Sequence, residues 1–166
     1  MDAIECLMTR RSVRRYKKED VKEDDLLSML KCALLAPSGS NKQVWELFVI
    51  QDKERLAKLS EVCTYGRFIR DAPLCIVVAG DEAKSGHILE DCSAASENIL
   101  LAAHALGYGG CWIAGWGKPY EDGVLDIIGA EKVGKVRLVS LIPIGVPDGR
   151  DDPKEKRSSE DAVHFV

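Results

Sequence analysis

The chain has 166 residues, of which 46% are hydrophobic and only 6% aromatic, so a single domain with an aliphatic core is expected over residues 1–166. Its formal net charge of −4 excludes an overall positive field that would attract nucleic acid. No segment has the pattern of a signal peptide or a membrane span, so we expect a cytoplasmic protein with no membrane partner.

The first half of the chain predicts three helices and one strand. Apolar spacing and capping residues predict helices over residues 2–9, 23–36 and 53–62, and a strand over residues 45–50. The second helix ends before Pro37, because proline disfavours helical geometry in the residue that precedes it. Asp52 is placed to cap the third helix.

The second half predicts two buried strands around a long helix. The strands cover residues 74–79 and 136–144, and an alanine-rich helix covers residues 85–106 with Gly107 at its C-terminal cap. Between that helix and the last strand we expect a glycine-broken strand or turn and a short helix over residues 120–128. From Pro147 onward the chain is polar and irregular, but its last residues are apolar and need another surface to cover them. Such a tail either frays or wraps a partner subunit.

Residues 10–18 form a local basic segment. They carry six Arg or Lys and no acid, which leaves −10 on the rest of the chain. Arginine offers a planar fork of donors suited to phosphate, and Ser12 adds a hydroxyl. The segment therefore suits a small anion better than a long polyanion, although by itself it is also compatible with a solvated surface or a nucleic-acid patch.

Two further segments place polar or glycine backbone where a flat ligand could approach. Residues 36–45 combine a proline, two serines, a glycine and an asparagine, and residues 107–116 contain four glycines. The second segment follows a helix instead of a strand, so it is not a dinucleotide fingerprint. Each is also compatible with an ordinary turn.

The cysteines and histidines indicate no separate chemistry. The six cysteines have no C-x-x-C spacing, so we interpret them as small buried hydrophobes in a reducing compartment and expect no metal site. His87 and His104 fall on or beside the long helix and His164 in the tail, and none is expected to be catalytic.

Four blocks, in chain order, resemble the nitroreductase family of FMN-dependent oxidoreductases. The first is T-R-R-S-V-R-R-Y after a short helix, and the second is A-P-S-G-S-N-K-Q-V-W, which is similar to the family's A-P-S-x-x-N-x-Q-P-W. The third, E-N-I-L-L-A-A-H-A-L-G-Y-G-G-C-W-I, is similar to Q-N-L-L-L-A-A-x-x-L-G-L-G-x-x-W-I. The fourth, K-E-K-R-S-S-E-D-A-V-H-F, resembles a basic tail before a V-H-W close.

The resemblance implies an α+β fold, a three-layer sandwich with a mainly antiparallel sheet flanked by helices, a long central helix and an extended C-terminal tail. It implies ping-pong chemistry in which NADH or NADPH reduces FMN and an electron-poor small molecule, such as a nitroaromatic or a quinone, then takes the electrons. It also implies a homodimer with FMN at the subunit interface.

The resemblance assigns cofactor contacts to particular residues. Those expected to hold the FMN phosphate and the pyrimidine side of the flavin are Arg10, Arg11, Ser12 and Arg14. Those expected to reach the flavin from the other subunit are Pro37, Ser38, Gly39 and Asn41. Ala114 and Gly115 match backbone beside the flavin N5, and Arg157, with Lys156 as a neighbour, matches a tail arginine that returns to the phosphate. No catalytic side chain is required, and Arg14 is the candidate for tuning the flavin because it is permanently cationic.

Several alternatives stay open at this stage. Val44 replaces the family's proline, and Arg67 or Arg70 stands where some members place an asparagine and a lysine on the flavin. A flavin-binding redox sensor or storage module with little turnover, a specialised flavin-destroying or dehalogenating relative, and a nucleic-acid-binding protein are the competing hypotheses. The stretch at residues 80–90 is short, which argues against the large lid of the specialised relatives. The net charge of −10 outside residues 10–18 argues against nucleic-acid binding.

Overall fold

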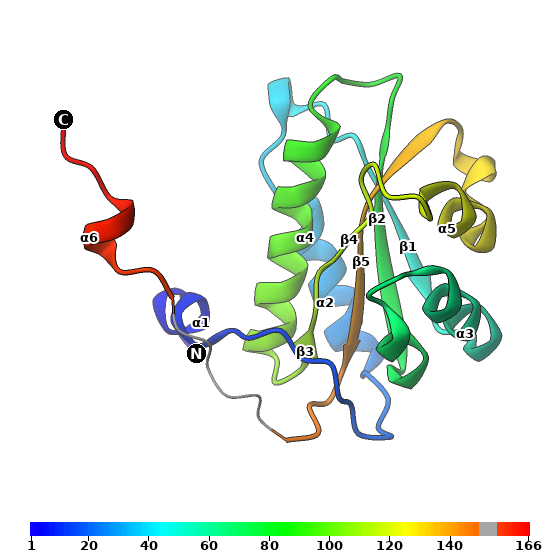
Figure 1. Ribbon diagram of the computed structural model, residues 1–166, viewed down its shortest axis with the longest axis horizontal. Helices are drawn as coiled ribbons and strands as arrows, with labels where there is room; N and C mark the ends of the chain where they lie inside the picture. Colours follow the sequence, from blue (N-terminus) through cyan, green and yellow to red (C-terminus); the bar gives the residue numbers. More distant parts are fainter. Residues whose placement is uncertain (150–155) are drawn as a thin grey trace.

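A computed structural model describes residues 1–149 and 156–166 of the chain. Its sheet lies between two helical layers, as Figure 1 shows: α2 (Glu23–Leu34) and α4 (Ile88–Ala105) cover one face, and α3 (Lys53–Val62) and α5 (Glu121–Ile128) cover the other. This three-layer arrangement confirms the expected α+β sandwich and its long central helix, α4.

The sheet is antiparallel throughout. Its main path runs β1 (Trp45–Ile50), β2 (Leu74–Asp81), β5 (Val136–Gly145) and β3 (Gly109–Gly110), and the short β4 (Ile113–Ala114) also pairs with β5. Almost every residue of β2 and β5 is buried, as their unbroken apolar sequences predicted. The glycine-rich stretch that follows α4 forms two short strands, β3 and β4, and both pair with β5.

Two apolar clusters fill the space on either side of the sheet. One joins the sheet to α2 and α4 and includes Met29, Ile76, Ile99 and Ile142. The other joins the sheet to α3 and α5 and includes Leu59, Val77 and Leu141. Because Ile76 and Val77 are neighbours on β2 and face opposite layers, the strand alternation itself separates the two cores.

Local capping sets the helix ends much as the sequence indicated. The Asp52 carboxylate accepts the Arg55 backbone N–H at 2.9 Å at the start of α3. Gly107, at φ +90°, ends α4: its N–H bonds the His104 carbonyl, and the Tyr108 N–H bonds the Ala103 carbonyl. These two bonds are the Schellman pattern that a glycine at this position favours.

Several boundaries differ from the sequence predictions: α2 ends at Leu34, two residues early, and β2 extends to Asp81. The helix expected from Ser85 begins only at Ile88, because the Ser85 hydroxyl accepts the His87 N–H at 3.1 Å and holds this stretch in a turn. The tail, expected to be irregular, contains the one-turn helix α6 (Ser159–Ala162), capped by the Ser158 hydroxyl on the Asp161 N–H. The apolar end of the tail is exposed, with Phe165 97% accessible.

Candidate functional site

The basic segment is bound to the glycine-rich edge strand through backbone contacts. Ser12 forms a parallel bridge with Gly110, and the Val13 N–H donates to the Gly110 carbonyl at 3.0 Å. Gly109 makes this approach possible, because a Cβ at its position would lie 2.4 Å from Val13 Cγ2. The structure thus brings together two segments, residues 10–14 and 109–111, that lie almost 100 residues apart in the sequence.

Cys111, next to Gly110, lies in the electrostatic field of the basic segment. Burial raises the pKa of the Cys111 thiol, while the Arg14 charge, the Ser12 side chain and the Arg10 charge act in the opposite direction. The Arg10 Nε also lies 3.5 Å from a carboxylate oxygen of Glu97 on α4.

Arg11 and Arg14 take different directions. The Arg11 guanidinium donates to the carbonyls of Met8 and Arg10, so it turns back onto the end of α1 (Ala3–Thr9). The Arg14 guanidinium carbon lies 6.0 Å from the centroid of the Phe68 ring. Arg14 therefore connects the basic segment to the short 3-10 helix η2 (Arg67–Asp71), which carries Phe68.

Ala114 presents an N–H group at the edge of the sheet. Its neighbour Gly115 donates its own N–H to the Val139 carbonyl at 2.9 Å, and Ala114 faces Ser140 in the β4–β5 register. Since alternate residues of an antiparallel ladder direct their polar groups to opposite sides, the N–H and C=O of Ala114 point away from β5. The C=O accepts the Tyr120 hydroxyl, which leaves the N–H directed outward.

The segment that follows Ala114 is held by a buried carboxylate, Glu121. Its two oxygens accept the Gly117 N–H at 2.9 Å, the Arg137 Nε at 2.6 Å and the Leu138 N–H at 3.1 Å. Burial disfavours the ionised form of Glu121, but these hydrogen bonds outweigh that effect and lower its pKa. The Arg137 guanidinium also stacks over the Trp116 ring, 4.3 Å from the ring centroid. Residues 114–117 are therefore rigidly supported.

The loop at residues 37–41 lies at the other end of α4. It contains the 3-10 turn η1 (Gly39–Asn41), and the Gly39 N–H donates to the Asp91 carboxylate at 2.9 Å in the first turn of α4. Leu100, which borders Gly110, follows Asp91 by nine residues, or about 14 Å along the helix. One chain therefore does not bring Pro37, Ser38, Gly39 and Asn41 together with the basic segment (Figure 1).

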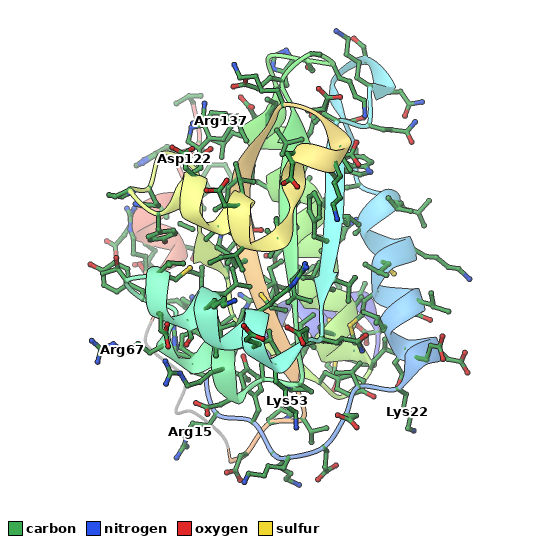
Figure 2. All side chains as sticks on the ribbon, turned by 90° about the vertical axis from the view of Figure 1, so that its right-hand side faces the viewer. Arg15, Lys22, Lys53, Arg67, Asp122 and Arg137 are labelled. Atoms are coloured by element: carbon green, nitrogen blue, oxygen red, sulfur yellow. The ribbon has the colours of Figure 1, made fainter. Side chains whose placement is uncertain are left out.

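Among the remaining basic candidates, Arg157 and Arg70 have hydrogen-bond partners outside residues 10–14. Arg157 donates to the Asp161 carbonyl within its own tail, and Lys156 is exposed. The Arg70 Nε donates to the Ser60 hydroxyl at 2.8 Å, and Arg67 projects from the surface in Figure 2. A shallow pocket joins the side chains of Ser60, Glu61, Arg67 and Arg70.

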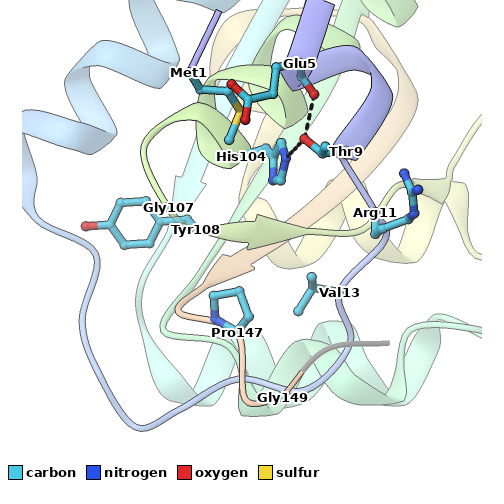
Figure 3. Close-up of a pocket in the computed structure, with 10 residues that line it drawn as sticks. All are labelled: Met1, Glu5, Thr9, Arg11, Val13, His104, Gly107, Tyr108, Pro147 and Gly149. Carbon is cyan, nitrogen blue, oxygen red and sulfur yellow. Dashed lines mark hydrogen bonds between the residues drawn. The ribbon is translucent and has the colours of Figure 1, made fainter. Parts of the chain in front are cut away.

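A second pocket lies behind the basic segment, between α1 and the end of α4 (Figure 3). There Thr9 donates its hydroxyl hydrogen to the Glu5 carbonyl at 2.6 Å, so the 2.8 Å contact between Thr9 and His104 uses a hydrogen on the His104 Nε2. Burial lowers the pKa of His104, and the nearby charges of Arg10 and Arg11 act in the same direction. His104 thus has a structural partner that accounts for its placement.

The cysteines and the helices carry no further functional signal. All six cysteines are free thiols, and burial raises the pKa of Cys63 and Cys92 to about 12. Within residues 1–149 and 156–166, no cluster of three or more His, Cys, Asp or Glu side chains is placed to hold a metal ion. In the same part of the chain, no helix is both long and apolar enough to cross a membrane.

The sequence pattern of the nitroreductase family matches residues 7–66 and 60–146. The chain belongs to the nitroreductase family. A relative from Methanothermobacter thermautotrophicus, with the provisional name NADH dehydrogenase/NAD(P)H nitroreductase, is 39% identical over an alignment of 151 residues that covers 89% of this chain and 78% of the relative. A relative of the same provisional name from Archaeoglobus fulgidus is 34% identical over 98% of this chain and 97% of its own.

Solved structures agree with this family membership. The structure of an FMN-dependent nitroreductase from Clostridium difficile matches with a TM-score of 0.84 and 38% identity, covering 98% of each chain. The family resemblance drew attention to residues 10–14, 37–41 and 114–115, but not to the groups that support them. Tyr120, Glu121 and Asp91 were missed, because no local motif marks them. In addition, Glu121 and Asp91 have partners that lie on other segments of the chain.

Proposed function

We propose that this chain is an enzyme that binds FMN and uses it to transfer electrons from NADH or NADPH to a small electron-poor acceptor. The family membership and the names of the NAD(P)H- and FMN-dependent relatives support this proposal. The observation that carries it is the docking of the basic segment on the glycine-rich edge strand, which gathers phosphate donors beside an outward-directed backbone N–H.

The donor set fits the chemistry of FMN. A phosphate dianion is best held by guanidinium, hydroxyl and backbone N–H donors, and Arg10, Arg11 and Ser12 supply the first two kinds. Ala114 follows Cys111 by three residues, so its N–H lies within about 10 Å of the Cys111 backbone, which adjoins the bridge between Ser12 and Gly110. The hydrogen-bond donors of the basic segment and the Ala114 N–H are therefore close enough to contact the same extended ligand.

Each residue has a separate task in the proposed site. Arg10, Arg11 and Ser12 hold the phosphate, for which the Arg11 guanidinium has to leave the Met8 and Arg10 carbonyls. Arg157 is an additional phosphate donor whose loss weakens binding less. Arg14 stabilises negative charge on the pyrimidine side, because a guanidinium keeps its charge at every working pH. The Ala114 N–H orients N5, a task that Gly115 cannot share because its own N–H is bonded to Val139.

When bound, FMN accepts a hydride from the nicotinamide and passes electrons on to the acceptor. The chain itself needs to supply no proton at a side chain for this chemistry. Its residues bind the phosphate, stabilise charge and orient the reacting edge. We further propose that donor and acceptor use the same open face in turn, which is a ping-pong order.

The proposed working unit is a homodimer. The loop formed by Pro37, Ser38, Gly39 and Asn41 lies at the opposite end of α4 from the basic segment of its own chain, and the family resemblance assigns it to the flavin held by a second copy. Apolar side chains on α1 support a covering partner, since Leu7 is 57% and Met8 71% exposed. A monomer in sedimentation that still holds FMN with full affinity would contradict this arrangement.

The six free thiols favour a reducing compartment, and we therefore place the reaction in the cytoplasm.

Steady-state oxidation of NADH and NADPH with a quinone or a nitroaromatic acceptor tests the proposed activity. We expect multiple turnovers per FMN and parallel double-reciprocal lines, which are the kinetic pattern of a ping-pong order. A protein that is reduced once by NAD(P)H and does not turn over with any acceptor would instead be a redox sensor or storage module.

A further inference from the structure

Asp91 is a buried carboxylate that makes only part of the hydrogen bonds it is able to make. The residue is 4% exposed in the first turn of α4, and its Oδ1 accepts the Gly39 N–H at 2.9 Å. Its Oδ2 is fully buried and has no hydrogen-bond partner in the part of the chain that the structure describes. A native group of this kind requires an explanation, because burying an acceptor without a partner is unfavourable.

Stability does not explain the carboxylate. The N-terminus of α4 favours a negative charge, but an asparagine would accept the same Gly39 N–H without the cost of burying that charge. Glu121 shows the contrast, since that buried carboxylate is satisfied on both oxygens. Asp91 therefore has the properties of a residue kept for function at the expense of stability.

The loop that Asp91 holds is conformationally unfavourable. Ser40, Asn41 and Gln43 all have φ between 49° and 56°, the left-handed region that residues with a Cβ rarely adopt. Within the loop, the Ser38 hydroxyl accepts the Gln43 N–H at 3.1 Å. Such a run of strained residues persists only when its surroundings impose it.

Asp91 on α4 and His87, which caps this helix, both contact Gly39, the residue that precedes the strained run. The carboxylate accepts the Gly39 N–H, and the His87 ring lies so close that a Cβ on Gly39 would be 3.1 Å from its Cδ2. The loop is thus held at Gly39 between the Asp91 carboxylate and the His87 ring. Pro37, Ser40 and Asn41 are exposed and Ser38 is half-buried, so the loop is accessible to a ligand.

We propose that Asp91 is a positioning residue that holds the loop of residues 37–41 in the conformation that meets the flavin of a partner subunit. This inference rests on the proposed function, and it assigns to α4 the task of shaping the half of the site that the basic segment does not supply. Asp91 does not touch the ligand itself and acts through the Gly39 backbone.

Trypsin cleavage after Lys42 measures the loop directly, without bound FMN. Lys42 is exposed and follows the loop, so the rate at which its peptide bond is cut reports how often the loop leaves its clamped conformation. We expect Asp91→Ala to raise this rate about tenfold or more, because one hydrogen bond to a charged group is lost. Asp91→Asn, which keeps the acceptor for Gly39, and Glu90→Ala, on the exposed neighbour, should cleave at close to the wild-type rate.

Two further readouts separate positioning from a general structural role. The melting temperature of FMN-free Asp91→Ala should be unchanged or raised, while its affinity for added FMN should fall about tenfold. A lowered melting temperature with cleavage at Lys42 and FMN affinity equal to those of Glu90→Ala would overturn the proposal. If wild-type protein does not bind FMN but Asp91→Ala still loosens the loop, the proposed function fails while the clamp on the loop stands.

Discussion

Replacing Gly109 with alanine should detach the basic segment from the sheet. The new Cβ would lie 2.4 Å from Val13 Cγ2 and 2.6 Å from Val13 Cβ, whereas ordinary van der Waals contact begins at 3.4 Å. Val13 must therefore retreat by about 1 Å, and its N–H bond to Gly110, now 3.0 Å, would lengthen beyond hydrogen-bonding distance. Ser12 and Arg14, on either side of Val13, would move with it.

The expected size of the effect follows from overpacking and from the lost anion contacts. Inserting a methyl group into a filled position destabilises a protein by about 1–3 kcal/mol. Displacing the donors on either side of Val13 should weaken FMN binding about tenfold or more, because charge-assisted hydrogen bonds depend steeply on geometry. Thermal unfolding of the FMN-free protein and fluorescence titration with FMN measure the two quantities separately.

A compensating substitution makes the test specific. Val13→Ala removes both Cγ atoms, including the one nearest to the new Cβ, but it keeps the Val13 Cβ at 2.6 Å, so the double variant should recover only part of the FMN affinity that Gly109→Ala loses. Normal FMN affinity and an unchanged melting temperature in Gly109→Ala would refute the reasoning that docking of the basic segment requires a glycine here.

Three other substitutions test individual contacts. Arg14→Ala should weaken FMN binding about tenfold or more, whereas the matched control Lys18→Ala, on an exposed residue of the same segment, should not change it; equal titration curves for the two variants would contradict the role of Arg14. Tyr120→Phe removes the bond to the Ala114 carbonyl and should lower the free energy of unfolding by about 1 kcal/mol and slow anaerobic flavin reduction in stopped-flow absorbance; a wild-type reduction rate would show that the Ala114 peptide needs no such support. Glu121→Gln should destabilise the fold at neutral pH by about 1–3 kcal/mol. Because folding lowers the pKa of Glu121, its ionised form stabilises the fold above the unfolded value of 4.5, and this contribution is lost as the pH falls through the folded-state pKa. The stability difference between wild type and Glu121→Gln should therefore shrink in acid denaturation below about pH 4.5, and a difference that grows there would be incompatible with a lowered pKa.

The elements of the fold follow from local chemistry, and most could be predicted. The strand over residues 45–50 and the helix that Asp52 caps lie where apolar spacing and the capping carboxylate indicated. Gly107 ends α4 because only a left-handed residue completes that cap easily. The start of α4 was predicted wrongly, since the Ser85 hydroxyl accepts the His87 backbone N–H in a local turn that precedes the helix.

The candidate site was harder to predict, because its supports are contacts between distant residues. Glu121 is an ordinary acid in a first helical turn until β5 places Arg137 and Leu138 against it. Asp91 shows no local motif, because its partner Gly39 lies 52 residues earlier. The association of residues 10–14 with the glycine-rich strand could be inferred only from the family resemblance, not from composition or spacing.

The visible absorbance spectrum of the purified protein, before and after anaerobic addition of NADH or NADPH, tests the central claim most directly. The account predicts a yellow protein that carries or takes up one FMN per chain, with an absorbance that bleaches on addition of at least one of the two nicotinamides. A colourless protein that does not bind added FMN would contradict it.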